Sequence, residues 1–235
     1  MSTPSRALDR LVQRLDEVHT LVGLCTPEDA DLTARLAARQ RDAALCRAAL
    51  VLLCGHMEGF FEEFVEDIVG FHEHHQTPIK DVAVRLRMAQ LSRLLRTATG
   101  NHEQAAWDAV QELRQATVAD EAASCAPGTL DAELIIDGFA VPGSDEVEGL
   151  LASVGIDRVW EGLPSDKLHL KKSLDALVHR RHPIAHGDAS ATATRGDLSD
   201  YSANMLELAK VLDERVARVL EAQHGATDPW AKLPR

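Results

Sequence analysis

Residues 48–71, AALVLLCGHMEGFFEEFVEDIVGF, contain the longest apolar run of the chain and four of its five phenylalanines. Up to Met57 the stretch is apolar almost all round, whereas its later turns carry carboxylates on one side. A helix that is hydrophobic on nearly every side is a buried helix. We therefore predict that this stretch is the centre of a long core helix, which begins with a cap near residues 26–28 and ends near His75.

Composition narrows the class of protein. The 235 residues are 45% hydrophobic and 26% charged, which is typical of a globular chain long enough to bury one core. Only 4% are aromatic, while Ala, Leu, Glu and Arg abound, and this favours helix over sheet. The formal charge of −12 argues against a protein that coats long nucleic acid, so any RNA-binding site must be a local basic patch.

Hydrophobic periodicity extends the helical pattern along the chain. Amphipathic helices are predicted at residues 5–24, 80–99, 103–123, 144–154 and 198–223, with one more starting near residue 164. Ser144 and Asp145 are both candidate N-caps. The expected result is an all-α bundle with a long central helix and a C-terminal helix pair. We predict one domain over 1–223, with an N-terminal helix in 1–27 and an irregular connector at 124–143 (in preference to a short strand), then a flexible tail at 224–235.

Two further features of the sequence carry expectations about packing and location. Gly55 and Gly59 share one helix face, which predicts a close approach of another helix. The four cysteines are scattered without a Cys-x-x-Cys pair or a secretory signal, so we expect free, mostly buried thiols. The apolar run at 48–54 is shorter than the ~20 residues that a membrane helix needs. The sequence therefore predicts a soluble, cytoplasmic protein without a membrane partner.

The most basic segment ends in residues 180–188, RRHPIAHGD. Between residues 166 and 186, five lysines and arginines stand against two aspartates. Arg181 can hold a phosphate through paired hydrogen bonds, and His186 can move a proton near neutral pH. These are the minimum parts for cleaving an RNA backbone without a metal. A solvated helix face is the competing interpretation of the basic segment.

A helix delivers this motif. Leu170, Leu174 and Leu177 precede Arg181 at steps of four, three and four, which places Arg181 at the end of an apolar stripe. In an unbroken helix, Arg181 and His186 would lie about 140° apart around the axis. Because a residue that precedes proline disfavours helical geometry, we expect a kink or restart at Pro183 that lifts His186 toward Arg181.

Other chemistries find little support in the sequence. Residues 72–75, HEHH, resemble half of a metal site, but no second cluster supplies the remaining ligands at a recognisable spacing. A solvated helix end is the better interpretation. The chain contains no phosphate-cradling Gly-rich loop and no G-x-S-x-G elbow. We therefore expect no metal and no cofactor.

Two stretches together resemble a known superfamily. Residues 181–187, RHPIAHG, resemble the HEPN signature of an arginine, a polar residue, a short spacer and Ala-His-Gly. Upstream, residues 55–61, GHMEGFF, resemble the Leu-Glu-Gly-Phe-Phe stretch of the HEPN-like nucleases that include the RiboL-PSP group. The segment 144–156 and the closing helix also stand where that branch has them. The resemblance covers about residues 40–222.

The resemblance implies an α-helical bundle that dimerises, with the Arg/His motifs of both subunits in one cleft. It also implies metal-independent endoribonuclease activity, often that of a toxin or antiphage effector. Carried over by position, Arg181 and His186 are catalytic, and His182 takes the polar position that is usually Asn. Some relatives have a Tyr that an antitoxin modifies two residues after the motif histidine; here Asp188 stands there, which disfavours that control. Other relatives have lost catalysis and serve as binding domains.

The sequence thus predicts an endoribonuclease that leaves a 2′,3′-cyclic phosphate and a 5′-OH. Arg181 and His186 are the catalytic candidates, with His182 as an auxiliary acid. Glu58 is a further candidate, because a carboxylate in a core helix needs a partner and Arg181 could supply it; a structural ion pair is the alternative. The candidate substrate contacts are Lys171, Lys172, His179 and Arg180. The expected partners are RNA, a second copy and an antitoxin or defence protein. The competing prediction is a helical interaction module that cuts nothing.

Overall fold

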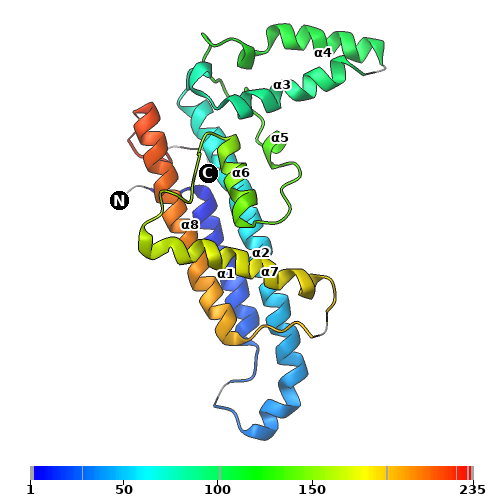
Figure 1. Ribbon diagram of the computed structural model, residues 1–235, viewed down its shortest axis with the longest axis vertical. Helices are drawn as coiled ribbons and strands as arrows, with labels where there is room; N and C mark the ends of the chain where they lie inside the picture. Colours follow the sequence, from blue (N-terminus) through cyan, green and yellow to red (C-terminus); the bar gives the residue numbers. More distant parts are fainter. Residues whose placement is uncertain are drawn as a thin grey trace.

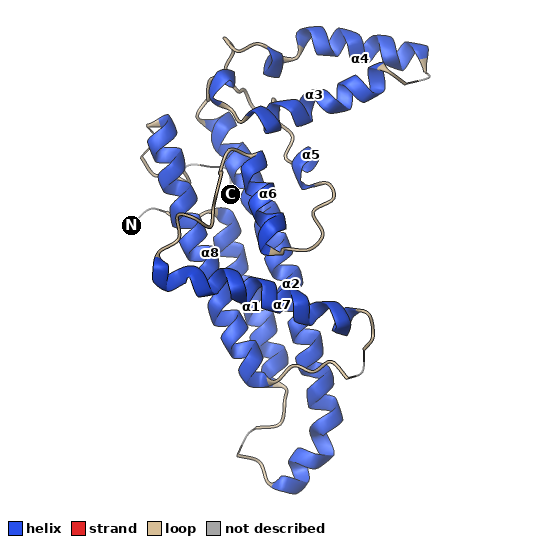
Figure 2. Cartoon of the chain, viewed as in Figure 1, coloured by secondary structure: helices blue, strands red, loops and turns tan. Residues whose placement is uncertain are grey.

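The structure is a computed structural model that describes residues 3–27, 29–100, 102–188, 190–225, 227–231 and 233. Within these ranges every regular element is a helix, and the only β-type pairing is an isolated bridge between Pro78 and Ser124 (Figure 2). The elements in chain order are α1 (Arg6–Gly23), α2 (Leu32–His74), η1 (Ile79–Asp81), α3 (Val84–Ala98), α4 (Glu103–Gln115), η2 (Thr117–Ala119), α5 (Glu133–Ile136), α6 (Ser144–Ser153), η3 (Ser165–Lys167), α7 (Leu168–Ala185) and α8 (Arg195–His224).

Helix α2 is the axis of the molecule. Helices α1 and α8 run along it, α7 crosses the bundle, and the α3–α4 hairpin extends from the end at which α2 stops (Figure 1). The first turns of α2 extend beyond the bundle at the opposite end. The predicted all-α fold, with its long central helix and its C-terminal pair α7 and α8, is confirmed.

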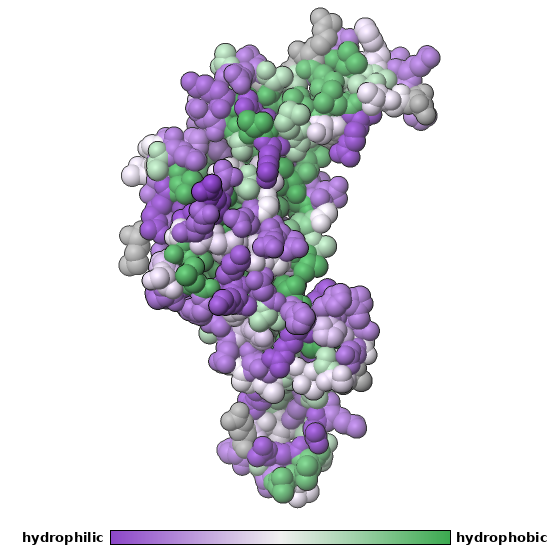
Figure 3. All heavy atoms as spheres, viewed as in Figure 1, coloured by the Kyte–Doolittle hydropathy of each residue, from purple (hydrophilic) through white to green (hydrophobic). Residues whose placement is uncertain are grey.

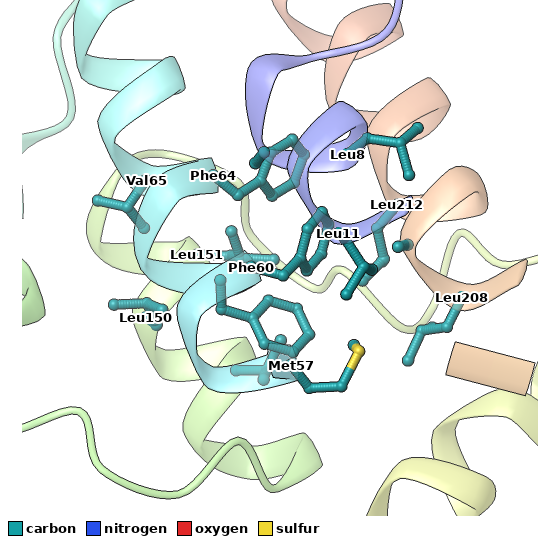
Figure 4. Close-up of a cluster of buried hydrophobic side chains, with 14 of the residues drawn as sticks. Leu8, Leu11, Met57, Phe60, Phe64, Val65, Leu150, Leu151, Leu208 and Leu212 are labelled. Atoms are coloured by element: carbon teal, nitrogen blue, oxygen red, sulfur yellow. The ribbon is translucent and has the colours of Figure 1, made fainter. Parts of the chain in front are cut away.

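The core lies where α2 meets the other long helices. The side chains of Phe60, Phe61, Phe64 and Phe71 are fully buried, and the rings of Phe60 and Phe64 stack with centroids 5.3 Å apart. Figure 4 shows leucines of α1, α6 and α8 converging on this cluster. Burying each such side chain stabilises the fold by about 1.5–3 kcal/mol, so this cluster holds four helices together.

The expected close helix approach at the two glycines of α2 is wrong. A Cβ added to Gly55 would meet no heavy atom within 4 Å, and one added to Gly59 would meet only the Arg14 side chain, with Nη1 at 3.0 Å. The Phe side chains of the same helix make the close contacts on a different face. The glycine face therefore looks onto open space or a flexible side chain.

Two predicted helix starts differ from the structure. Helix α2 begins at Leu32, where Asp31 is the N-cap and accepts a hydrogen bond from Ala34 N, and not near residues 26–28; Glu28 lies outside the described residues. Helix α6 has Gly143 at its N-cap position, and Ser144 is already helical. The Ser144 backbone N and Oγ donate to Asp175 on α7 instead, at 2.8 and 2.9 Å. A tertiary contact therefore replaces the predicted local cap.

The segments expected to be irregular are more ordered than predicted. The connector 124–143 contains the one-turn helix α5. In the tail, Trp230 is only 4% exposed and its ring centroid lies 5.8 Å from that of Phe64. Asp228 accepts hydrogen bonds from the backbone N and Oγ1 of Thr3. Within the expected tail, residues 227–231 thus place a large aromatic side chain over the core.

Helix α2 is also long and apolar enough to cross a membrane by length and composition alone. Of its most apolar 18-residue window, 44% is buried inside the bundle, and the core helix of a soluble protein passes the same test. The cytoplasmic location remains a prediction.

The N-terminus of α1 is held by two buried carboxylates. Ser5 N donates to Asp213 of α8 at 3.2 Å, and Ala7 N donates to Asp67 of α2 at 2.9 Å. The Arg6 Nε atom lies 3.1 Å from Asp67 Oδ1. These acceptors satisfy backbone donors that a helix start leaves unpaired. Burial raises the pKa of Asp213 to about 6, and the nearby charge of Asp67 adds to the effect.

This raised pKa predicts a pH dependence of stability. A carboxyl whose folded-state pKa lies above its usual value binds its proton more tightly in the folded state, so its contribution to stability grows as pH falls from about 7 toward 4. We expect Asp213→Asn to raise the free energy of unfolding at pH 7.5 by about 1–3 kcal/mol, with the gain shrinking toward pH 4.5. Thermal unfolding across this range measures it.

The matched control for this measurement is Asp200→Asn, the same substitution at an exposed aspartate of α8 that does not act on Asp213. Its stability difference from the wild type should be small and should not follow the same pH window. A loss of stability in Asp213→Asn at pH 7.5 would mean that the ionised carboxylate is needed to hold the start of α1.

Candidate functional site

Helix α7 places the motif by its apolar stripe. The side chains of Leu170, Leu174 and Leu177 are fully buried, and Arg181 continues the same side of the helix as a half-buried residue. This confirms that Arg181 lies on the inward side of α7. The stripe packs α7 against α2 and α8, and so turns the guanidinium toward the core helix.

Helix α7 does not restart at Pro183, which was one of the two predicted outcomes there. Helix α7 runs through Pro183 to Ala185, and His186 N still donates to His182 O at 3.1 Å. The proline lies in the last turn, so the helix loses only the one hydrogen bond that its missing N–H would have made, and the neighbouring bonds suffice. The motif histidine therefore sits at the C-cap of a continuous helix.

Gly187 ends the helix directly after the motif histidine. Its φ is +81°, a left-handed conformation that favours glycine. Gly187 N donates to Ile184 O at 3.1 Å and Asp188 N donates to Pro183 O at 2.9 Å. These two bonds make a Schellman motif. The glycine of the sequence signature thus fixes where His186 stands.

The continuous helix pairs His186 with His182 and not with Arg181. The ring centroids of His182 and His186 lie 4.3 Å apart, and both side chains are exposed. Arg181 is separated from His186 by about 140° around the axis. One subunit therefore presents two imidazoles on its outer side and a guanidinium on its inner side.

Arg181 lies in the electrostatic field of α2. Burial raises the pKa of the Cys54 thiol to about 11, and the charge of Arg181 opposes that shift. Burial also raises the pKa of Glu58, the charge of Glu62 raises it further, and Arg181 lowers it. Among the described residues, no hydrogen bond or ion pair within 4.0 Å engages the Arg181 guanidinium. Glu58 thus acts on Arg181 from a distance, without the direct ion pair that the sequence suggested.

The basic segment is only partly available to a ligand. Lys171 Nζ lies 3.9 Å from Asp145 and over the ring of Trp160, and Lys167 pairs with Glu207. Lys172 and His179 are exposed and share the outer side of α7 with His182 and His186. This exposed row, which we call the α7 outer row, consists of Lys172, His179, His182 and His186.

Arg180 holds the loop that follows the motif. Its Nη1 lies 2.8 Å from Asp197 and its Nε donates to Thr192 O at 3.0 Å. Asp197 also closes a capping box with Thr194 at the start of α8. Asp197 was not among the residues predicted from the sequence, although the Thr-x-x-Asp spacing before a helix indicates a cap there. The arginine therefore ties α7 to α8.

A metal site is not evident in the parts of the chain that the structure describes, because no group of three or more His, Cys, Asp or Glu there could hold an ion. His72 is buried with Nδ1 3.3 Å from Thr77 Oγ1, and burial lowers its pKa to about 4. All four cysteines are buried and free, as predicted. Cys25 and Cys46 are neighbours, with their Sγ atoms 3.8 Å apart.

An all-α bundle built on a long core helix, with an Arg/His motif at the end of the penultimate helix, is the architecture of a HEPN-type domain. The profile of one family, RiboL-PSP-HEPN, matches residues 9–218, and the chain belongs to this family. HEPN domains are often ribonucleases, so membership supports a nuclease or RNA-related function at the level of the family. No curated protein matches the chain, and no solved structure matches it.

The left-handed conformation of Gly187 predicts a specific stability cost. We expect Gly187→Ala to lower the free energy of unfolding by about 1 kcal/mol or more, because L side chains rarely adopt positive φ. Gly149 is the matched control: it lies inside α6, and a Cβ there meets nothing within 4 Å. Gly149→Ala should stabilise by up to about 1 kcal/mol. Urea unfolding of the two variants gives both values; equal effects would contradict the helix ending described above.

Proposed function

We propose that this protein is a metal-independent endoribonuclease. The observation that carries the proposal is the pair of exposed imidazoles, His182 and His186, at the end of α7, whose inward side carries an Arg181 without a hydrogen bond or ion pair among the described residues. An arginine supplies fixed positive charge for a phosphate, and histidines supply groups that accept and donate protons near neutral pH. Together they cover the roles that RNA cleavage by its own 2′-OH requires.

The reaction would proceed by in-line attack. His186 takes the proton from a ribose 2′-OH while that oxygen bonds to the adjacent phosphorus. Arg181 stabilises the negative charge that develops on the phosphate oxygens. The bond from phosphorus to the 5′-oxygen breaks, and a protonated imidazole gives that oxygen its proton. The products are a 2′,3′-cyclic phosphate and a 5′-OH.

A second copy of the chain would complete the site. Because Arg181 and His186 lie on different sides of α7, one subunit does not direct both at a single phosphate. A two-fold dimer that brings the two α7 ends together would supply Arg181 from one subunit and His186 from the other. The second His186 is then one source of the acid, and His182 is the source within the subunit.

The remaining candidates divide by their contacts. Lys172 and His179, both in the α7 outer row, would bind flanking phosphates. Lys171 is placed near Asp145, and Arg180 is engaged by Asp197, so they would contribute less to substrate binding. Glu58 would act as a positioning residue, since its carboxyl group on α2 interacts electrostatically with Arg181.

In the cell, we propose a role as a toxin or antiphage-type effector in the cytoplasm, held in check by an antitoxin or defence-system protein. The competing function is a binding module of the same fold that cuts nothing. The separation of Arg181 from His186 within one subunit, and the overall charge of −12, favour that second function. Cleavage assays separate the two.

The first assay incubates a mixed RNA pool with the purified protein and excess chelator. We expect cleavage by the wild type with cyclic-phosphate ends, and a loss of at least 100-fold, roughly the size of one general acid–base contribution, in His186→Ala. Arg181→Lys should also lose activity, because lysine keeps the charge but not the paired donors. His74→Ala, at an exposed histidine of α2, is the control and should cleave normally. Products with a 5′-phosphate, or activity that chelator abolishes, would exclude the mechanism.

Mixing two inactive variants tests the shared site. Arg181→Ala and His186→Ala proteins, each inactive alone, should regain a substantial fraction of wild-type cleavage after being mixed and allowed to exchange subunits. Recovery is expected because a mixed dimer contains one intact Arg181 and one intact His186 across the interface. A mixed dimer that forms, as shown by differently tagged subunits, and yet stays inactive would mean either that each subunit must carry both groups or that the second His186 is the required acid.

A further inference from the structure

Helix α3 carries an apolar stripe of four residues, three of which are exposed in the described chain. The stripe consists of Val84, Met88, Leu91 and Leu95, at steps of four, three and four. Val84 is 62%, Met88 48% and Leu95 46% exposed, while Leu91 is half-buried. A stripe with this spacing is the apolar face of an amphipathic helix, which normally packs against another element. We call these four residues the α3 stripe.

The opposite side of α3 is the one that holds it to the bundle. Leu86 is fully buried, and Gln90 exchanges two hydrogen bonds with the backbone of Asp131, at 3.1 and 3.0 Å. Both lie well over 90° around the helix from Val84. Leu91 also packs against the core, whereas Val84, Met88 and Leu95 do not. Since α3 is already anchored by its other side and by Leu91, the three exposed side chains of the α3 stripe are not needed to hold the helix. Apolar atoms are visible on the α3–α4 hairpin in Figure 3.

Helix α3 is positively charged, whereas the chain as a whole is negatively charged. The helix contains four arginines and no carboxylate, in a chain of net charge −12. Arg87 forms an ion pair with Glu121, with Nη1 3.3 Å from Oε1, and its side chain is only 14% exposed. Arg85 and Arg96 are exposed, and their spacing of eleven residues puts them about 20° apart on one edge of the α3 stripe. The stripe therefore has a cationic border.

The composition of α3 argues against two possible binding partners of the α3 stripe, a second copy of the chain and a single-stranded RNA. An antiparallel two-fold pairing of α3 with a second copy would set the arginines of one copy against the same arginines of the other, and like charges in contact are destabilising. A single-stranded RNA would find arginines, but its bases stack on aromatic rings, and α3 has none. Four aliphatic side chains on one line do not match a hydrated anionic strand.

We propose that the α3 stripe, with Arg85 and Arg96, is the docking face for an amphipathic helix of a partner protein whose apolar face is flanked by carboxylates. The partner's apolar side chains bury Val84, Met88 and Leu95, and its carboxylates pair with the two arginines. Burial supplies the affinity, and the complementary charges select an acidic helix and orient it.

The docking face is remote from the motif. The α3–α4 hairpin forms one end of the long axis, whereas the C-terminal end of α7 lies beyond the middle of the molecule toward the other end (Figure 1). A helix bound at α3 would leave Arg181 and His186 uncovered. This surface would recruit or tether a partner, and its existence does not depend on the proposed nuclease activity.

The test uses synthetic fluorescent peptides and the full-length protein. One peptide is a stabilised helix with Leu at the spacing of the α3 stripe and Glu on both borders; a second has Lys in place of Glu. We expect the acidic peptide to bind the wild type with an affinity that falls as salt rises, and the basic peptide to bind at least ~10-fold more weakly. The double substitution Met88→Gln and Leu95→Gln should lower the affinity for the acidic peptide at least ~10-fold.

Reversing the charge of the two arginines is the most direct test of the proposed charge complementarity. The variant with both Arg85→Glu and Arg96→Glu should lose its affinity for the acidic peptide and bind the basic peptide instead. Neither unfolding nor non-specific adsorption would reverse the preference in this way. Val12→Gln, at an exposed apolar residue of α1, should leave both affinities unchanged. Binding of the acidic peptide that survives both double variants, or no binding by the wild type, overturns the proposal.

Two other outcomes also overturn it. A labelled RNA oligonucleotide that loses affinity in the arginine variant, while the peptide does not, would make α3 a nucleic-acid surface. A change of oligomeric state in the Met88/Leu95 variant, measured by sedimentation, would make the stripe an interface between copies. Cleavage assays on the same variants keep this result separate from the proposed function, because neither α3 variant touches Arg181 or His186.

Discussion

The burial of the phenylalanine side of α2 is the constraint on which the other elements depend. Phe60, Phe61 and Phe64 must leave water, and only the combined apolar faces of α1, α6 and α8 cover them. The same helix also sets the electrostatics of the motif, because Cys54 and Glu58 lie on its side toward α7. The core helix is therefore both the scaffold and one wall of the candidate site.

The site shows how packing can override a local preference. A residue before proline disfavours helix, yet the Leu170–Leu174–Leu177 stripe and the Schellman ending at Gly187 keep α7 helical through Pro183. The consequence is chemical as well as geometric. Two imidazoles meet at 4.3 Å, while the guanidinium points to the core. A nuclease built on this arrangement needs a second subunit to bring all of its groups to one phosphate.

Charge is distributed so that the acidic chain keeps two local basic regions. One is the basic segment that ends at Arg181, of which only part stays free because Arg180 and Lys167 are engaged by carboxylates. The other is α3, whose cations border an apolar stripe. The first region has histidines and faces a core carboxylate; the second has aliphatic side chains. We propose different partners for them, a phosphodiester for the first and an acidic helix for the second.

The sequence by itself determined the all-α fold, the long core helix, the inward position of Arg181 and the burial of the four cysteines, because apolar periodicity records which face is buried. Only the tertiary structure decided the rest. Contacts between elements far apart in the chain moved the start of α6 from a predicted cap to a bond with Asp175, and ordered the tail by placing Trp230 on Phe64. They also paired Arg180 of α7 with Asp197 of α8. Local pattern carries no information about such partners, since their energy comes from groups that meet only when the chain has folded.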